Sequence, residues 1–278
     1  KRQGYAFIAS PTLYPGQKMR ARVLSDVNNP QPFISRLYIK HYSKDERTIL
    51  VKGPQVVMPP GSEYELQWML DDLGGEPIVE AGIEFETKTA GVNKAYLDYL
   101  TWDGGPKVNL RRPQQGSSMW RRAWVNAVDI WQPFWPEAYR LIQNSGVGLL
   151  IQGTRDWRDY RVSAVIRFHL VQTAGLAVCV QGLRRYYAML LSRQGKLRLV
   201  KLLNGEVLLA EQDFPYEEES DYQLCLQTEG EHLQGWVDGV LKFDVQDTEN
   251  PLRCGGIALI CEEGCISCNE VLVSSVVE

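Results

Sequence analysis

Hydrophobic residues in the first hundred positions recur at every second residue within short runs. In RLYIKHY (36–42), the apolar residues Leu37 and Ile39 share one parity with His41, and Arg36 shares the other with the remaining polar side chains. Side chains of a strand alternate between its two faces, so this pattern predicts a strand with one apolar face. Comparable runs, separated by Gly- and Pro-rich stretches, continue through residues 5–102. They predict an all-β sandwich without helices.

A second set of strand-like runs begins after a change in composition. Residues 103–119 are rich in Gly, Pro, Ser and Gln and lack apolar periodicity, as linkers do. Beyond a tryptophan-rich segment that we expect to pack onto its domain, about ten further runs are joined by turns such as RQGK, LNGE and VDGV. We therefore predict a sandwich over 1–110, a linker over 111–119 and a second, lectin-like or jelly-roll sandwich over 120–278.

Composition and charge limit the classes of partner. The 278-residue chain is 44% hydrophobic and carries a net charge of −4. No apolar run approaches the roughly 18 residues of a membrane span. The negative charge disfavours nucleic acids and anionic bilayers, although Arg-Arg pairs at 111–112, 121–122 and 184–185 depart locally from it. We expect neither a nucleic-acid partner nor a membrane partner.

The opening KRQGYAFIAS has neither an initiating methionine nor the apolar core of a secretory signal. We interpret the chain as part of a longer protein. All six cysteines fall at position 179 or later, within strand-like runs, which is unlike a small disulfide-stapled secreted domain. This distribution favours the cytoplasm.

The stretch CEEGCISC (261–268) spaces three cysteines as C-x3-C-x2-C, with Cys254 upstream. We expect Glu-Glu-Gly at 262–264 to form a hairpin loop, with Cys261 and Cys265 opposite each other and Cys268 on the other face. Free thiols in strands are the favoured interpretation. A metal site that includes Cys254 and a Cys261–Cys265 disulfide remain as alternatives.

Several segments of the second half resemble a known module. The chain over 120–278 resembles the concanavalin A-like sandwich appended to bacterial ADP-ribosylglycohydrolase family proteins and, more weakly, laminin-G-like sandwiches. The segments that carry the likeness are GTRDWRDY, QGLRRYYAMLL, GWVDG and GGIAL. The first half, with SPTLYPGQKMRARV and AYLDYLTWDGGP, looks like a galactose-binding-type jelly roll.

The resemblance implies an accessory region of a larger hydrolase. In that family the catalytic domain is all-helical and holds two magnesium ions with Asp and Glu residues, a pattern that this β-rich sequence lacks. Any hydrolase activity would therefore belong to an upstream catalytic domain of the same chain. The implied ligand is a carbohydrate or an ADP-ribose-like molecule.

Two segments offer candidate ligand-binding residues. GTRDWRDY places Arg155, Asp156 and Trp157 together, and an aromatic ring beside charged forks suits a sugar. The alternative is that Trp157 closes the end of the sandwich. In QGLRRYYAML, alternation puts Arg184 and Tyr186 on one face, which we predict to be open, and Tyr187 on the core face. A merely solvated face is the alternative.

Other chemistry has weaker support. Asp98 and Asp103 at the end of a strand could hold a structural calcium ion, and no other cofactor is indicated. The three histidines, His41, His169 and His232, lie in separate runs without a nucleophile signature. We therefore predict a non-catalytic, carbohydrate-binding accessory region. The alternatives are a structural or oligomerisation module and, less favoured, a glycoside hydrolase.

Overall fold

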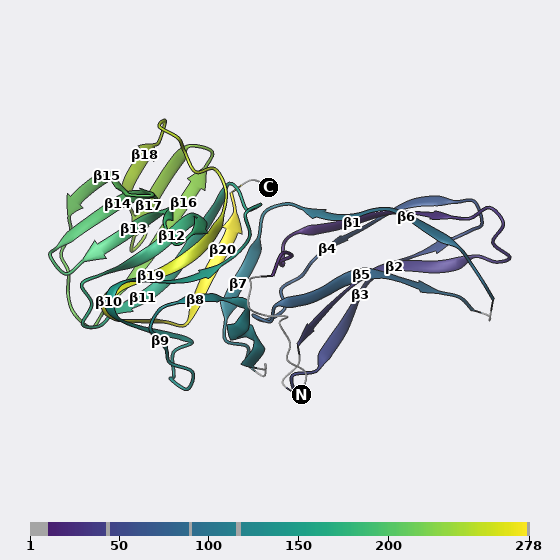
Figure 1. Cartoon of the computed structure of the whole chain (residues 1–278), viewed down its shortest axis with the longest axis horizontal. Helices are drawn as coiled ribbons and strands as arrows, with labels where there is room; N and C mark the ends of the chain where they lie inside the picture. The colour runs from purple at the N-terminus through teal and green to yellow at the C-terminus, as the bar shows by residue number, and fades with distance from the viewer. Residues whose placement is uncertain (1–10, 43–44, 89–90, 115–117, 277–278) are drawn as a thin grey trace.

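The chain is all-β, as predicted, and folds as two β-sandwiches that lie side by side (Figure 1). The computed structural model describes residues 11–42, 45–88, 91–114 and 118–276. Within these ranges the helical structure is one 3₁₀ helix, Ser118–Ala123. No helix of the described residues is long and apolar enough to cross a bilayer.

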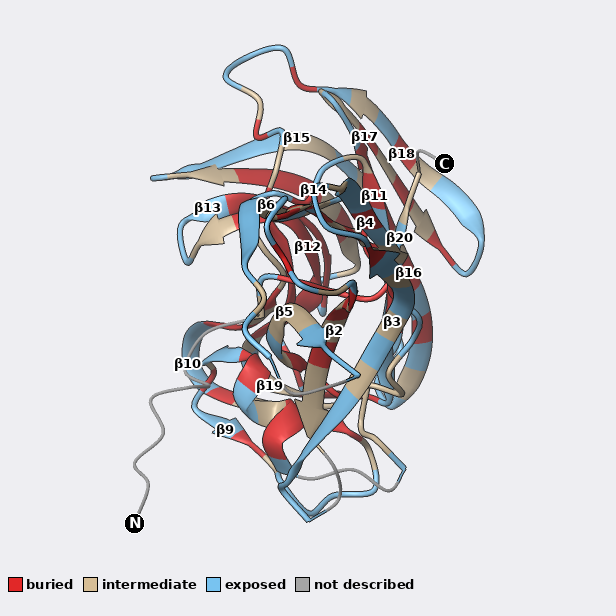
Figure 2. Cartoon of the chain, turned by 90° about the vertical axis from the view of Figure 1, so that its right-hand side faces the viewer, coloured by how far each residue is buried: buried red, intermediate tan, exposed pale blue. Residues whose placement is uncertain are grey.

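The first sandwich consists of two three-stranded antiparallel sheets. One has the order β4 (Glu63–Met69), β1 (Lys18–Ser25), β6 (Ala95–Asp103), and the other β3 (Thr48–Met58), β2 (Phe33–Tyr42), β5 (Ile78–Glu86). Met19, Ala21 and Val23 of β1 and Leu37 and Ile39 of β2 are buried between the sheets. The predicted alternation is confirmed, because buried positions alternate with partly or fully exposed ones along β1 and β2. The first sandwich faces the viewer in Figure 2, where each residue is coloured by its burial.

The second sandwich is larger, and its layers share one strand. The strands are β7 (Lys107–Arg111), β8 (Val125–Ala127), β9 (Ile130–Trp131), β10 (Tyr139–Gln152), β11 (Tyr160–Phe168), β12 (Thr173–Gly182), β13 (Arg185–Ser192), β14 (Lys196–Leu203), β15 (Glu206–Asp213), β16 (Ser220–Glu229), β17 (His232–Val237), β18 (Val240–Gln246), β19 (Gly256–Cys268) and β20 (Glu270–Ser275). One layer has the order β15-β14-β13-β12-β19-β10, and the other β7-β20-β11-β16-β17-β18. Most of β19 pairs with β10 and β12, but its end pairs with β11, so it passes from one layer to the other.

Aromatic side chains fill one end of this core. Trp120, Trp124 and Trp131 are buried around Tyr139, and the rings of Trp131 and Tyr139 stack at 5.7 Å. Three of the four tryptophans in the tryptophan-rich segment therefore pack onto the domain as expected. The fourth, Trp135, is 43% exposed.

The two sandwiches are joined by packing as well as by the chain. Strand β7 lies within the segment predicted for the first sandwich and its linker, and it pairs with β20 in the sheet of the second. Tyr14 reaches across the joint, where its hydroxyl accepts a hydrogen bond from the Gly153 amide at 3.2 Å. Its ring also contacts Trp157 edge-on at 4.7 Å. The exact domain boundaries stay a prediction.

The prediction of a hairpin at residues 262–264 is wrong, because the single strand β19 continues through this segment. Glu263 and Gly264 have positive φ angles of 45° and 147°, and the partner strand β10 skips from Gln143 to Val147 at this point. This is a β-bulge, which uses glycine at positive φ just as a hairpin does. A Cβ on Gly264 would lie 1.9 Å from the Leu170 carbonyl oxygen, so close packing also requires glycine here.

The four clustered cysteines consequently lie along one path rather than around a loop. Cys261 and Cys268 are buried, and Cys254 and Cys265 are partly exposed. All four are free thiols in the structure. Among the described residues, no three His, Cys, Asp or Glu side chains are grouped so that they could hold a metal ion.

Gly175 in β12 provides a test of this packing. A Cβ at that position would lie 1.9 Å from the Met189 carbonyl oxygen of β13, and backbone cannot move aside easily. Gly175→Ala should therefore destabilise the protein by about 1–3 kcal/mol in urea unfolding. Gly205→Ala, where a Cβ would meet no atom within 4 Å, is the matched control and should change stability little. Equal effects of the two variants would contradict the strand pairing.

Candidate ligand-binding site

A groove of about 490 Å³ opens on the outer face of the second sandwich, where a sheet ladder is interrupted. Arg167 of β11 pairs with Ser267 of β19, whereas Ser163 of β11 pairs with Leu272 of β20. Between these two pairs, β11 advances by four residues, whereas the path through β19 and β20 advances by five. This path therefore contains one extra residue, which forms a bulge near Asn269. No described strand pairs with residues 164–166 of β11 on this side. The groove is the space that this bulge leaves.

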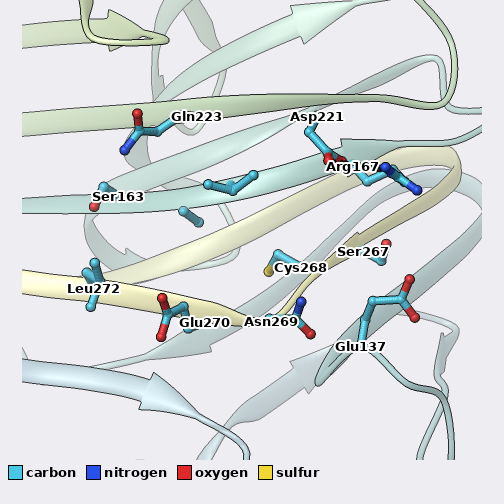
Figure 3. Close-up of a pocket in the computed structure, with 12 residues that line it drawn as sticks. Glu137, Ser163, Arg167, Asp221, Gln223, Ser267, Cys268, Asn269, Glu270 and Leu272 are labelled. Atoms are coloured by element: carbon cyan, nitrogen blue, oxygen red, sulfur yellow. Dashed lines mark hydrogen bonds and ion pairs between the residues drawn. The ribbon is translucent and has the colours of Figure 1, made fainter.

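Residues of four strands and one loop line the groove, most of them with outward-facing side chains. Alternation along β11 and β16 sends the residues between the core positions outward. The lining residues of these two strands are the outward-facing Ser163, Val165, Arg167, Asp221 and Gln223 and the buried Ala164. Ser267, Cys268, Asn269, Glu270 and Leu272 come from the bulged path, and Glu137 from the segment before β10 (Figure 3).

Arg167 and Asp221 form a two-point ion pair in the groove. The Arg167 Nε donates to Asp221 Oδ1 at 2.8 Å, and Nη2 donates to Oδ2 at 3.1 Å. The two side chains point toward each other from adjacent strands in Figure 3. This two-point contact raises the pKa of Arg167 and fixes the plane of the carboxylate. Asp221 therefore presents its remaining lone pairs in a defined direction.

The other carboxylates of the groove differ in their partners. Glu270 Oε2 accepts a hydrogen bond from Asn109 Nδ2 of β7 at 2.6 Å. Glu137 Oε2 is buried, and no described group donates a hydrogen bond to it. Such an atom is costly to leave without a donor. A ligand that brings a hydroxyl or an N–H group to this oxygen would satisfy it.

The floor of the groove offers apolar contact rather than a nucleophile. Val165 and Leu272 are exposed, and they lie on β11 and on the facing β20. Cys268 is buried beneath the groove, and its burial raises the pKa of the thiol, which keeps it protonated. The arrangement can hold a ligand by hydrogen bonds and aliphatic contact.

The residues predicted from GTRDWRDY lie elsewhere, at the joint between the sandwiches. Trp157 is 1% exposed and packs edge-on against Tyr14 and Tyr160. Its ring is therefore buried and cannot stack on a sugar, which agrees with the alternative that Trp157 closes the end of the sandwich. Asp156 lines a separate crevice between the two sandwiches, and Arg155 is exposed.

The residues predicted from QGLRRYYAML lie in the opposite layer from the groove. Tyr187 is in the main core, as the alternation predicts. Tyr186 faces the other side of the sheet, but it is only 2% exposed, within a small apolar cluster that includes Ala188. Burial raises the pKa of Tyr186 to about 12. Arg184 is exposed in the turn before β13, so strand alternation does not pair it with Tyr186.

The predicted calcium ligands are both engaged by arginines. Asp103 forms an ion pair with Arg20 at 2.6 Å, and Asp98 forms one with Arg22 at 3.3 Å. The two aspartates occupy different positions along β6 and have different partners. The structure does not bring them together.

Residue chemistry alone did not single out the groove. Arg167, Asp221 and Glu270 are ordinary charged residues of strands, and Glu137 follows a loop. One sequence signal is local to β11. In YRVSAVIRF, the outer face carries the polar residues Arg161, Ser163 and Arg167, with one exposed valine, Val165, between them. The pairing that brings three distant segments together is not visible in any one of them.

Comparisons with known proteins assign no family. No protein-family model matches the chain, and no curated protein matches it. Among solved structures, it is similar to the carbohydrate binding module CBM66 from Bacillus subtilis at 17% identity, covering 55% of this chain and 95% of that one, with a TM-score of 0.49.

Two further solved structures show a comparable degree of likeness. A protein of unknown function with a galectin-like fold from Bacillus subtilis is 13% identical, with 56% and 90% of the two chains covered and a TM-score of 0.46. Galectin LEC-6 from Caenorhabditis elegans is 15% identical, with 42% and 83% covered and a TM-score of 0.35. Likeness of this degree assigns neither a family nor a function to this chain.

Proposed function

We propose that this chain is a non-catalytic binding module and that the groove beside β11 takes a carbohydrate. The observation that carries the proposal is the set of oriented polar groups over an apolar floor. The Asp221 carboxylate, and the Glu137 oxygen to which no described group donates, can accept hydrogen bonds from sugar hydroxyls. Val165 and Leu272 can contact the C–H faces of a sugar ring.

The charge of the groove favours a neutral sugar over an anionic one. Three carboxylates, those of Glu137, Asp221 and Glu270, line it against the single guanidinium of Arg167, which Asp221 already neutralises. A pyrophosphate would meet uncompensated negative charge here. Between the two ligand classes expected from the sequence, the groove therefore favours a neutral saccharide over ADP-ribose.

Loss of either key acceptor should weaken binding. Glu137→Gln and Asp221→Asn each keep the shape of the side chain but remove its charge. Because a hydrogen bond to a charged group contributes about 1.5–3 kcal/mol, each should weaken binding about tenfold or more. The assay is a neutral-glycan array, followed by calorimetry on the strongest glycan. Asp213→Asn, an exposed carboxylate of β15, is the matched control and should bind like the parent.

Two results would overturn this proposal. If the chain binds no neutral glycan on the array, the proposed function is wrong. Binding that survives in both groove variants but is lost in Arg184→Ala or Tyr186→Ala would move the site to the β13 layer.

The wider setting follows from the sequence resemblance. We propose that the chain accompanies a catalytic domain of the ADP-ribosylglycohydrolase type in the cytoplasm and helps to place it on carbohydrate. Burial raises the pKa of the Cys268 thiol beneath the groove, so this cysteine is protonated and does not act as a nucleophile there. Turnover of ADP-ribosylated protein or of aryl glycosides by this chain alone would contradict the proposal.

A further inference from the structure

The loop between β9 and β10 exposes two aromatic side chains. Phe134 is 96% exposed and Trp135 is 43% exposed, and Pro133 and Pro136 flank them. The loop leaves from β9, at the lower rim of the second sandwich in Figure 1. An exposed phenylalanine side chain contributes no packing energy to the fold. Phe134 lines neither the groove beside β11 nor the crevice between the sandwiches. We call residues 133–136 the aromatic tip.

The aromatic tip is held by arginines from two other segments. The Arg112 guanidinium donates to the carbonyl oxygens of Trp135 at 2.8 Å, Pro136 at 3.5 Å and Glu137 at 2.9 Å. The Arg140 guanidinium lies 4.6 Å from the centre of the Trp135 ring. The two prolines have no amide hydrogen to satisfy. The carbonyl groups of residues 135–137 accept hydrogen bonds from Arg112 and do not need water as a partner. This lowers the free-energy cost of dehydrating the aromatic tip.

Positive charge gathers beneath the aromatic tip. Arg112 and Arg140 contact it directly, and Arg121 lies over the neighbouring Trp131 at 4.1 Å. Burial lowers the pKa of Arg121, and the nearby charge of Arg112 adds to this effect. In the described part of the chain, no carboxylate forms an ion pair with any of the three arginines. One arginine from each of two Arg-Arg pairs that depart from the acidic average, Arg112 and Arg121, thus lies here.

We propose that the aromatic tip binds the surface of an anionic lipid bilayer. Phe134 and Trp135 would enter the boundary between headgroups and acyl chains, and the guanidiniums would contact anionic headgroups. The net charge of the whole chain predicts no membrane partner, but the local charge here has the opposite sign. The cytoplasmic leaflet carries the anionic lipids that this charge would contact.

A saccharide fits the aromatic tip less well than a lipid surface. Phe134 has no polar atom, whereas sugar sites combine aromatic rings with converging polar groups in a concavity. Here the neighbouring carbonyls are already occupied by Arg112, so they are not available to sugar hydroxyls. An apolar, convex tip above positive charge is complementary to a headgroup layer.

Flotation with vesicles tests the proposal. The whole chain should float with phosphatidylcholine vesicles that contain about 30% phosphatidylserine, and 0.5 M salt should weaken this binding through screening. Phe134→Ala with Trp135→Ala should weaken it about tenfold or more, since the two aromatic rings that would be buried in the lipid are lost. Leu183→Ala, which removes a hydrophobic residue that is 53% exposed elsewhere on the surface, is the control and should bind like the parent.

Three results would overturn the proposal. One is no flotation with phosphatidylserine vesicles, and another is equal flotation with pure phosphatidylcholine. The third is self-association that disappears in the Phe134→Ala variant, because the tip would then be a contact between protein copies. Circular dichroism of the double variant establishes that it is folded. Glycan binding by the groove should be unchanged in it, so the two proposals fail separately.

Discussion

Replacing Trp157 by alanine should lower the free energy of unfolding by about 3–5 kcal/mol. The side chain is almost completely buried between Tyr14, which precedes β1, and Tyr160 of β11. Gly153 makes room for it, since a Cβ there would lie 2.6 Å from the indole ring. The substitution leaves a large cavity at the joint of the two sandwiches, which urea unfolding followed by circular dichroism would detect.

Two companion variants sharpen this test. Trp135→Ala removes a partly exposed ring and should cost less than about 1 kcal/mol. Trp157→Phe keeps most of the buried area and removes the indole nitrogen, to which no described group is hydrogen-bonded, so its cost should lie well below that of alanine. If Trp157→Ala is as stable as Trp135→Ala, the indole does not fill the joint as described.

Replacing Lys201 by methionine should destabilise the second sandwich by a comparable amount, about 3–5 kcal/mol. Lys201 of β14 and Asp247 are both buried, with Nζ and Oδ2 2.7 Å apart. Tyr187 donates to the same carboxylate oxygen at 2.5 Å, and its own oxygen accepts the Leu252 amide at 2.8 Å. Methionine would leave a buried carboxylate without its counter-charge, and thermal unfolding would report the loss.

The same network predicts a dependence on pH. Burial alone raises the pKa of Asp247, but hydrogen bonds from Lys201 and Tyr187 outweigh it and hold the pKa below its usual value of 3.8. The carboxylate therefore contributes stability above the pKa of the unfolded chain, and this contribution is lost as the pH falls through the folded pKa. Asp247→Asn, measured against the parent from pH 6 to pH 2, should show a smaller loss on acidification. An identical loss would contradict this role.

Local alternation was sufficient to predict which residues of several strands face the core, but it did not predict that the second face of β13, with Tyr186, is buried as well. In β13, the placement of Tyr187 in the core follows from its parity with Met189 and Leu191. The same rule gives the inner face of β1 and β2. These predictions depend only on the two-residue period of a strand, which each segment carries by itself.

Features that depend on pairing between distant segments could not be predicted. Gly264 at positive φ suits a hairpin and a bulge equally well, and the packing of Leu170 against it requires the bulge. Burial of Trp157 depends on Tyr14, more than a hundred positions earlier. The groove likewise needs Arg167, Asn269 and Glu137 to meet at one interruption of the sheet.

Hydrogen–deuterium exchange with and without a saturating neutral glycan tests the location of the site most directly. We expect slower exchange in residues 163–167 of β11 and 267–272 of the bulged path, with no change around residues 184–190. Protection confined to the β13 segment, or no protection in a chain that binds the glycan, would contradict it.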